Sequence, residues 1–109
     1  MSAATIPASF ILPNGLTAFG LTANDTLNVY HDIFDEDCYR MHGVTIRDGD
    51  CILDVGANTG LFVLFLNHIG AKVRVYAFEP APAIFQVLSC NVETHNKLPV
   101  QVLDRKSVV

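Results

Sequence analysis

The sequence is poor in basic residues and has no long hydrophobic run. Its 109 residues include seven lysines and arginines against eleven aspartates and glutamates, so the formal net charge is −4. Contacts with phosphates need clustered basic side chains, which argues against a nucleic-acid-binding protein. The longest apolar run, residues 61–66, is far shorter than the roughly 20 residues of a membrane-spanning helix. We therefore expect neither nucleic acid nor a membrane as a partner.

Several short motifs of redox, metal and hydrolytic proteins are also missing. Cys38, Cys51 and Cys90 form no Cys-x-x-Cys pair, which favours reduced thiols in a cytoplasmic protein, with Cys51 buried. The four histidines lack zinc-type spacing, and no serine lies in a Gly-x-Ser-x-Gly motif. The acidic run at residues 35–37 is interpreted as a solvated turn rather than a divalent-metal site. Residues 1–9 contain no basic or long apolar stretch, so we expect no signal peptide.

The composition indicates one small globular unit with an N-terminal extension. Half of the residues are hydrophobic and the mean hydropathy is +0.34, which is enough for a buried core. Within the extension, residues 1–45, the pair Asn14-Gly15 between two apolar runs predicts a small β-hairpin. Apolar residues at helical spacing then predict an amphipathic helix over residues 25–34, with Asn24 or Asp25 as its N-cap.

Residues 46–109 show an alternating β-α-β-α-β pattern. A buried strand begins at Cys51, an apolar helix covers residues 61–69, and a second strand covers residues 73–78. A helix over residues 81–96 and a strand over residues 99–103 follow. This alternation predicts an α/β fold with a parallel sheet in the strand order 3-2-1, about one βαβαβ half of a Rossmann-like domain.

The turn after the first of these strands is the expected binding site. Two glycines punctuate it, and a helix begins there, so free backbone N–H groups would face a ligand. Glu79 ends the next strand, where nucleoside sites place an acid on ribose hydroxyls. An ordinary strand-to-helix turn, with Glu79 stabilising only the N-terminus of the following helix, is the alternative.

Two segments resemble a known family. Residues 54–60, Asp-Val-Gly-Ala-Asn-Thr-Gly, and residues 76–80, Tyr-Ala-Phe-Glu-Pro, resemble the first two motifs of class I S-adenosylmethionine-dependent methyltransferases, and the FkbM family in particular. The resemblance implies an incomplete Rossmann-like class I methyltransferase fold and O-methylation of a small hydroxyl-bearing molecule. It also implies S-adenosylmethionine as cofactor, with Asp54 acting on its ammonium group. The implied cofactor-binding residues are Asp54, Gly56, Ala57, Asn58, Thr59, Gly60 and Glu79.

Two other functions remain as alternatives. An NAD-dependent oxidoreductase fragment would need glycines where this turn has Asn58 and Leu61, which disfavours close passage of a pyrophosphate. A non-catalytic, truncated remnant could instead self-associate through an exposed sheet edge. The pattern identifies no catalytic base, although Tyr30, His31 or Tyr39 could contact a substrate.

Overall fold

The computed structural model describes residues 7–105, so the outermost parts of the predicted ranges, residues 1–6 and 106–109, lie outside the described residues. In chain order the elements are β1 (Ala8–Ile11), β2 (Thr17–Gly20), α1 (Ala23–Tyr30), the π-helical turn η1 (His31–Asp35), β3 (Cys51–Val55), α2 (Leu61–His68), β4 (Arg74–Phe78), α3 (Pro82–His95) and β5 (Val100–Leu103).

Three parallel strands form the main sheet, in the spatial order β3-β4-β5. Asp54 of β3 lies opposite Ala77 of β4, which lies opposite Val102 of β5. Because α2 and α3 alternate with these strands, the predicted β-α-β-α-β arrangement and strand order are confirmed. The chain is a small α/β protein whose sheet fits part of a Rossmann-like fold.

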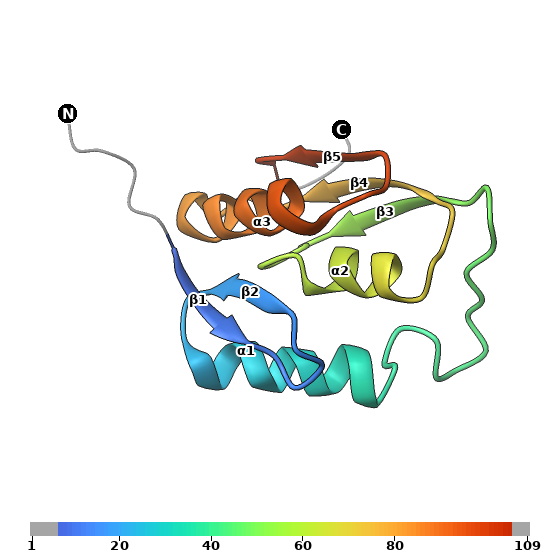
Figure 1. Cartoon of the computed structure of the whole chain (residues 1–109). Coiled ribbons are helices and arrows are strands. Elements are labelled where there is room, and N and C mark those ends of the chain that lie inside the picture. The colour runs from blue at the N-terminus through green and yellow to red at the C-terminus, as the bar shows by residue number, and fades with distance from the viewer. Residues whose placement is uncertain (1–6, 106–109) are drawn as a thin grey trace.

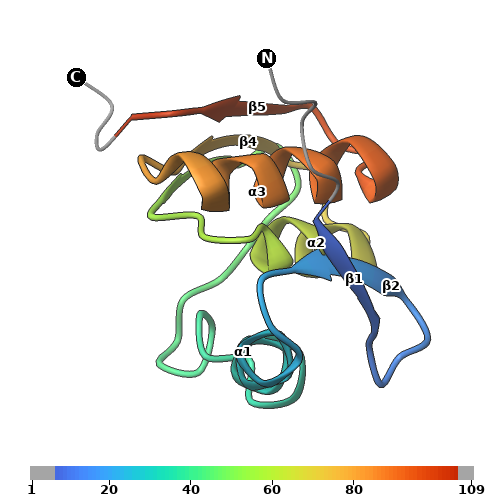
Figure 2. The same cartoon turned by 90° about the vertical axis from the view of Figure 1, so that its left-hand side faces the viewer.

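Both connecting helices lie on the same face of the sheet (Figure 1). Figure 2 shows the sheet as the outer layer, with α2 and α3 beneath it and the hairpin and α1 beyond these helices. On β3, Asp54 faces the helices and is buried, whereas Leu53 and Val55 are 55% and 58% exposed. We call the surface formed by Cys51, Leu53 and Val55, with Tyr76 beside Leu53, the bare face of the sheet.

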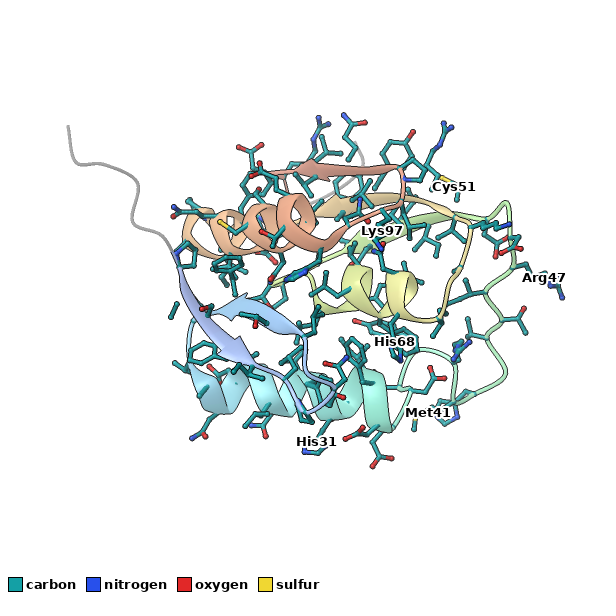
Figure 3. The ribbon with its side chains drawn as sticks, viewed as in Figure 1. His31, Met41, Arg47, Cys51, His68 and Lys97 are labelled. Carbon is teal, nitrogen blue, oxygen red and sulfur yellow. The ribbon has the colours of Figure 1, made fainter. Side chains whose placement is uncertain are left out.

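The position of Cys51 corrects one prediction. This residue was expected to be buried, but it is exposed at the start of β3 and lies at the outer sheet layer, away from α1 (Figure 3). An apolar run in a parallel sheet usually marks a strand that helices cover on both faces, but here α2 and α3 lie on the same face of the sheet. Cys38, Cys51 and Cys90 are all free cysteines.

The predicted N-terminal hairpin is confirmed. Strands β1 and β2 pair in antiparallel register, and the backbone N–H of Leu12 donates to the carbonyl of Leu16 across the turn. Gly15 has a φ of 88°, a left-handed conformation that glycine adopts without a Cβ penalty. The hairpin packs against α3, and Leu12 and Ala18 are buried in the same core as α2 and β4.

The predicted amphipathic helix is present, but its N-cap differs from the prediction. Thr22 is the N-cap, because its backbone is extended and its hydroxyl accepts a hydrogen bond from the backbone N–H of Asp25. Asn24 and Asp25 therefore lie inside the first turn. Further along, Tyr30 stacks on Phe34, whose ring meets Phe65 of α2 edge-on at a centroid distance of 5.4 Å. These ring contacts attach α1 and η1 to α2.

Candidate functional site

The loop between β3 and α2 alternates between ordinary and left-handed backbone conformations. Gly56, Asn58 and Gly60 have φ angles of 74°, 55° and 91°. Asparagine tolerates this region better than most residues with a side chain, which accounts for Asn58 between the two glycines. The backbone N–H groups of Gly56 and Ala57 both donate to the carbonyl of Phe78 at 2.9 Å, so the loop is held at the carboxyl end of β4.

The two loop glycines have different surroundings. A Cβ atom on Gly60 would lie 2.8 Å from Cδ1 of Leu88 and 3.7 Å from its Cα, because the loop passes directly over α3. A Cβ atom on Gly56 would meet no atom within 4 Å. Gly60 is therefore required both for its backbone conformation and for close packing, whereas Gly56 is required for conformation alone.

Glu79 joins the loop to the start of α3. Its side chain is 6% exposed; Oε1 accepts a hydrogen bond from the N–H of Asn58 at 2.9 Å, and Oε2 accepts one from the N–H of Ala81 at 3.1 Å. The bond to Ala81 is a contact with the N-terminus of α3. Such a contact is also expected if the segment is only an ordinary strand-to-helix turn. Each carboxylate oxygen can accept a second bond, so these contacts leave acceptor capacity for a ligand.

Asp54 is the most unusual polar group in the site. It is 8% exposed, and within residues 7–105 its Oδ2 atom has no hydrogen-bond partner. Burial raises the pKa of this carboxyl group to about 6, with a further contribution from the negative charge of Glu79. A buried carboxylate oxygen without a partner is costly, and a cationic ligand would compensate that cost.

A hollow of about 210 Å3 lies beside the loop. It is lined by residues 56–59 together with Tyr39 and Phe62, whose rings pack at a centroid distance of 4.2 Å. Burial raises the pKa of the Tyr39 hydroxyl, and the charge of Asp54 adds to this effect. A second hollow, of about 360 Å3, adjoins Asn58 and Thr59 from the side of α1. Both hollows are lined by Asn58 and Thr59 of the loop and by Val29 of α1.

The structure separates the three candidate substrate-contacting residues. Tyr39 lines the hollow beside the loop, whereas Tyr30 is buried against Phe34 in the core. His31 is exposed, pairs with Asp35 and lies on the outer side of η1 (Figure 3).

Sequence reasoning missed Asn91. This residue is fully buried on α3, and its side-chain amide donates a hydrogen bond to the carbonyl of Thr59 at 2.7 Å. The sequence signal that could have indicated it is a single amide side chain on the apolar face of the predicted helix, three residues after Leu88.

Comparison with known proteins yields methyltransferase relatives. The 31-O-demethyl-FK506 methyltransferase FkbM of Streptomyces tacrolimicus is 48% identical over 84 residues, which are 77% of this chain and 32% of that protein. Methyltransferase sdnD of Sordaria araneosa is 30% identical over 96 residues, 88% of this chain and 36% of that protein. The AMB antimetabolite synthetase AmbE of Pseudomonas aeruginosa is 40% identical over 81 residues, 74% of this chain and 4% of that protein.

The matches to proteins named as methyltransferases confirm the resemblance to FkbM-type methyltransferases that residues 54–60 and 76–80 carry. The chain spans about a third of the length of FkbM and of sdnD, at 32% and 36%, and 4% of AmbE. No family model and no solved structure matches it.

The different surroundings of the loop glycines generate a first prediction. We expect Gly56→Ala to lower the free energy of unfolding by about 1–2 kcal/mol, the cost of a left-handed alanine. We expect Gly60→Ala to cost about 3 kcal/mol or more, because overlap with Leu88 adds to the same strain. Urea denaturation of both variants measures the difference, and equal losses would contradict it.

The raised pKa of Asp54 generates a second prediction. In the folded protein this group holds its proton up to about pH 6, whereas in the unfolded chain it ionises near pH 4. The unfolded state therefore binds fewer protons in this window, so the contribution of Asp54 to stability falls as the pH rises. Between about pH 4 and pH 7 we expect the free energy of unfolding of Asp54→Asn to rise by about 3 kcal/mol relative to that of the unsubstituted protein. Parallel stability curves for the two proteins would show that the pKa is not raised.

Proposed function

We propose that this chain, a segment of the FkbM-type methyltransferases, carries the S-adenosylmethionine-binding half-site of an enzyme that methylates a hydroxyl group on a small molecule. The observation that carries the proposal is the buried, unpartnered oxygen of Asp54 beside the glycine-containing loop. The cofactor has a cationic ammonium group, which is the kind of partner that such a carboxylate lacks.

The other groups of the site also fit this cofactor. Residues 56–60 would lie against it, because Gly56 leaves open space on its side of the loop. Glu79 retains acceptor capacity for ribose hydroxyls while it holds Asn58 in place. Helix α2 begins at Leu61, and its N-cap residue, Gly60, makes no side-chain cap hydrogen bond. The first backbone N–H groups of α2 would therefore stabilise the carboxylate of the cofactor. When bound, S-adenosylmethionine would supply the methyl group, and the chain's own residues would bind and orient it.

The acceptor in this proposal is a small molecule with a free hydroxyl group. The printed name of the FkbM relative describes methylation of an oxygen atom, and the sequence has no excess of basic residues for nucleic acid. Within residues 7–105 no helix is long and apolar enough to cross a membrane. The free cysteines favour the cytoplasm as the compartment. Tyr39 lines the loop hollow and is the residue best placed to meet the acceptor.

Cofactor binding is tested by calorimetric titration with S-adenosylhomocysteine. We expect saturable binding that Asp54→Asn weakens about ten- to a hundredfold, because the neutral amide lacks the negative charge that would pair with the ammonium group. Glu93→Gln is the matched control, since it also removes one carboxylate, from the exposed side of α3. Titration with NAD in parallel separates the oxidoreductase alternative. Binding of NAD alone, or of neither compound by a folded chain, would contradict the methyltransferase proposal.

The bare face of the sheet supports a second candidate function, self-association. Leu53 and Val55 expose more than half of their surface, and within the described chain β3 pairs on one side only, with β4. An unpaired strand edge beside exposed apolar side chains favours pairing with another strand. In this proposal a second copy of the chain covers the bare face, whether or not cofactor binds.

Self-association is tested by size-exclusion chromatography with light scattering. We expect a concentration-dependent dimer or larger species that Leu53→Lys with Val55→Lys converts to a monomer. Val44→Lys is the control, because Val44 is 58% exposed but lies outside the sheet. A monomeric unsubstituted protein at high micromolar concentration would overturn the proposal.

A further inference from the structure

Asn91 connects three segments that are distant in sequence. Its side chain is fully buried on α3, one turn after Leu88, which packs under Gly60. Its Oδ1 atom accepts a hydrogen bond from the N–H of Phe19 at 2.7 Å. Its Nδ2 atom donates to the carbonyls of Phe19 at 2.9 Å and Thr59 at 2.7 Å. Both donor positions of the amide are therefore used.

The bond to Thr59 acts at a critical point of the loop. Thr59 lies between Asn58 and Gly60, which are both left-handed, so its carbonyl marks the reversal of the chain into α2. Glu79 accepts a hydrogen bond from the N–H of Asn58, the residue before Thr59, at 2.9 Å. Two buried side chains, one at the end of β4 and one on α3, thus fix the peptide groups on either side of the bond between residues 58 and 59.

The two bonds to Phe19 extend this connection to the hairpin. Asn91 engages both the N–H and the carbonyl of one residue of β2, as a neighbouring strand would. An apolar residue at position 91 would remove the partner of these two partly buried groups and leave the buried carbonyl of Thr59 unpaired. An asparagine is therefore a specific requirement at this position rather than one of several ways to fill the core.

We propose that Asn91 is a positioning residue for the cofactor site: it sets the conformation of the loop at residues 58–60 and makes that conformation depend on the docked hairpin. This inference rests on the proposed function only for the identity of the ligand. The residue touches neither the Asp54 carboxylate nor either hollow, so it acts through the loop backbone.

The test compares two identical chemical changes at different places. Asn91→Asp keeps the side-chain shape and removes both donated bonds. Asn67→Asp, the matched control, removes the bonds that Asn67 donates to the carbonyl of Val63 and to Asn96, near the end of α2. The first readout is amide hydrogen exchange in the ligand-free protein, followed at Gly60, whose N–H bonds to the carbonyl of Ala57. The second readout is the affinity for S-adenosylhomocysteine.

We expect Asn91→Asp to speed exchange at Gly60 and to weaken the affinity, each roughly tenfold more than Asn67→Asp does. Asn91→Ser is the milder variant if the aspartate prevents folding, and the same direction is expected. Changes at Gly60 no larger than those of the control would overturn the inference. If the unsubstituted protein binds no S-adenosylhomocysteine, the cofactor assignment fails, and exchange at Gly60 still decides whether Asn91 positions the loop.

Discussion

The buried amide of Asn91 bonds to backbone groups of β2 and of the loop before α2, and the rest of the site depends on this contact. These hydrogen bonds offset the desolvation cost of the buried amide, and they also fix where the loop lies over α3. That placement allows Leu88 to approach Gly60 and brings the N–H of Asn58 to Glu79. Asp54 differs from these residues because one of its oxygens has no partner within the described chain. The buried polar side chains of Asn91 and Glu79 thus have hydrogen-bond partners, whereas one oxygen of the buried Asp54 has none within the described chain.

Local sequence signals predicted most of the fold. Asn14-Gly15 gave the hairpin its turn, and the apolar residues of Leu61–His68 marked a helix that is buried over residues 61–66. The predictions failed where layers beyond the segment decide the outcome. Cys51 was expected to be buried, but α2 and α3 cover one face of the sheet only. The N-cap was placed two or three residues late, because Thr22, Asn24 and Asp25 are all suitable residues and only backbone geometry distinguishes them.

The candidate site divides in a similar way. The residue types in Asp54–Gly60 and Glu79 are visible as a motif, because backbone conformation and strand ends constrain them locally. Contacts between distant segments are not visible in this way. The packing of Tyr39 on Phe62, the missing partner of Asp54 and the bonds of Asn91 each require the assembled chain. Asn91 stands 72 residues from Phe19, and no periodicity of either segment indicates the other.

That separation of 72 residues has a consequence for how the chain is made. The hairpin is synthesised early, since β1 and β2 end before residue 21, but its anchor is near the end of α3. A two-stranded hairpin alone is at best marginally stable in water. The strands of the main sheet, in contrast, pair with their neighbours along the chain. The contact of β2 with Asn91 therefore forms only after α3 has been synthesised, so the hairpin precedes in synthesis the helix onto which it docks.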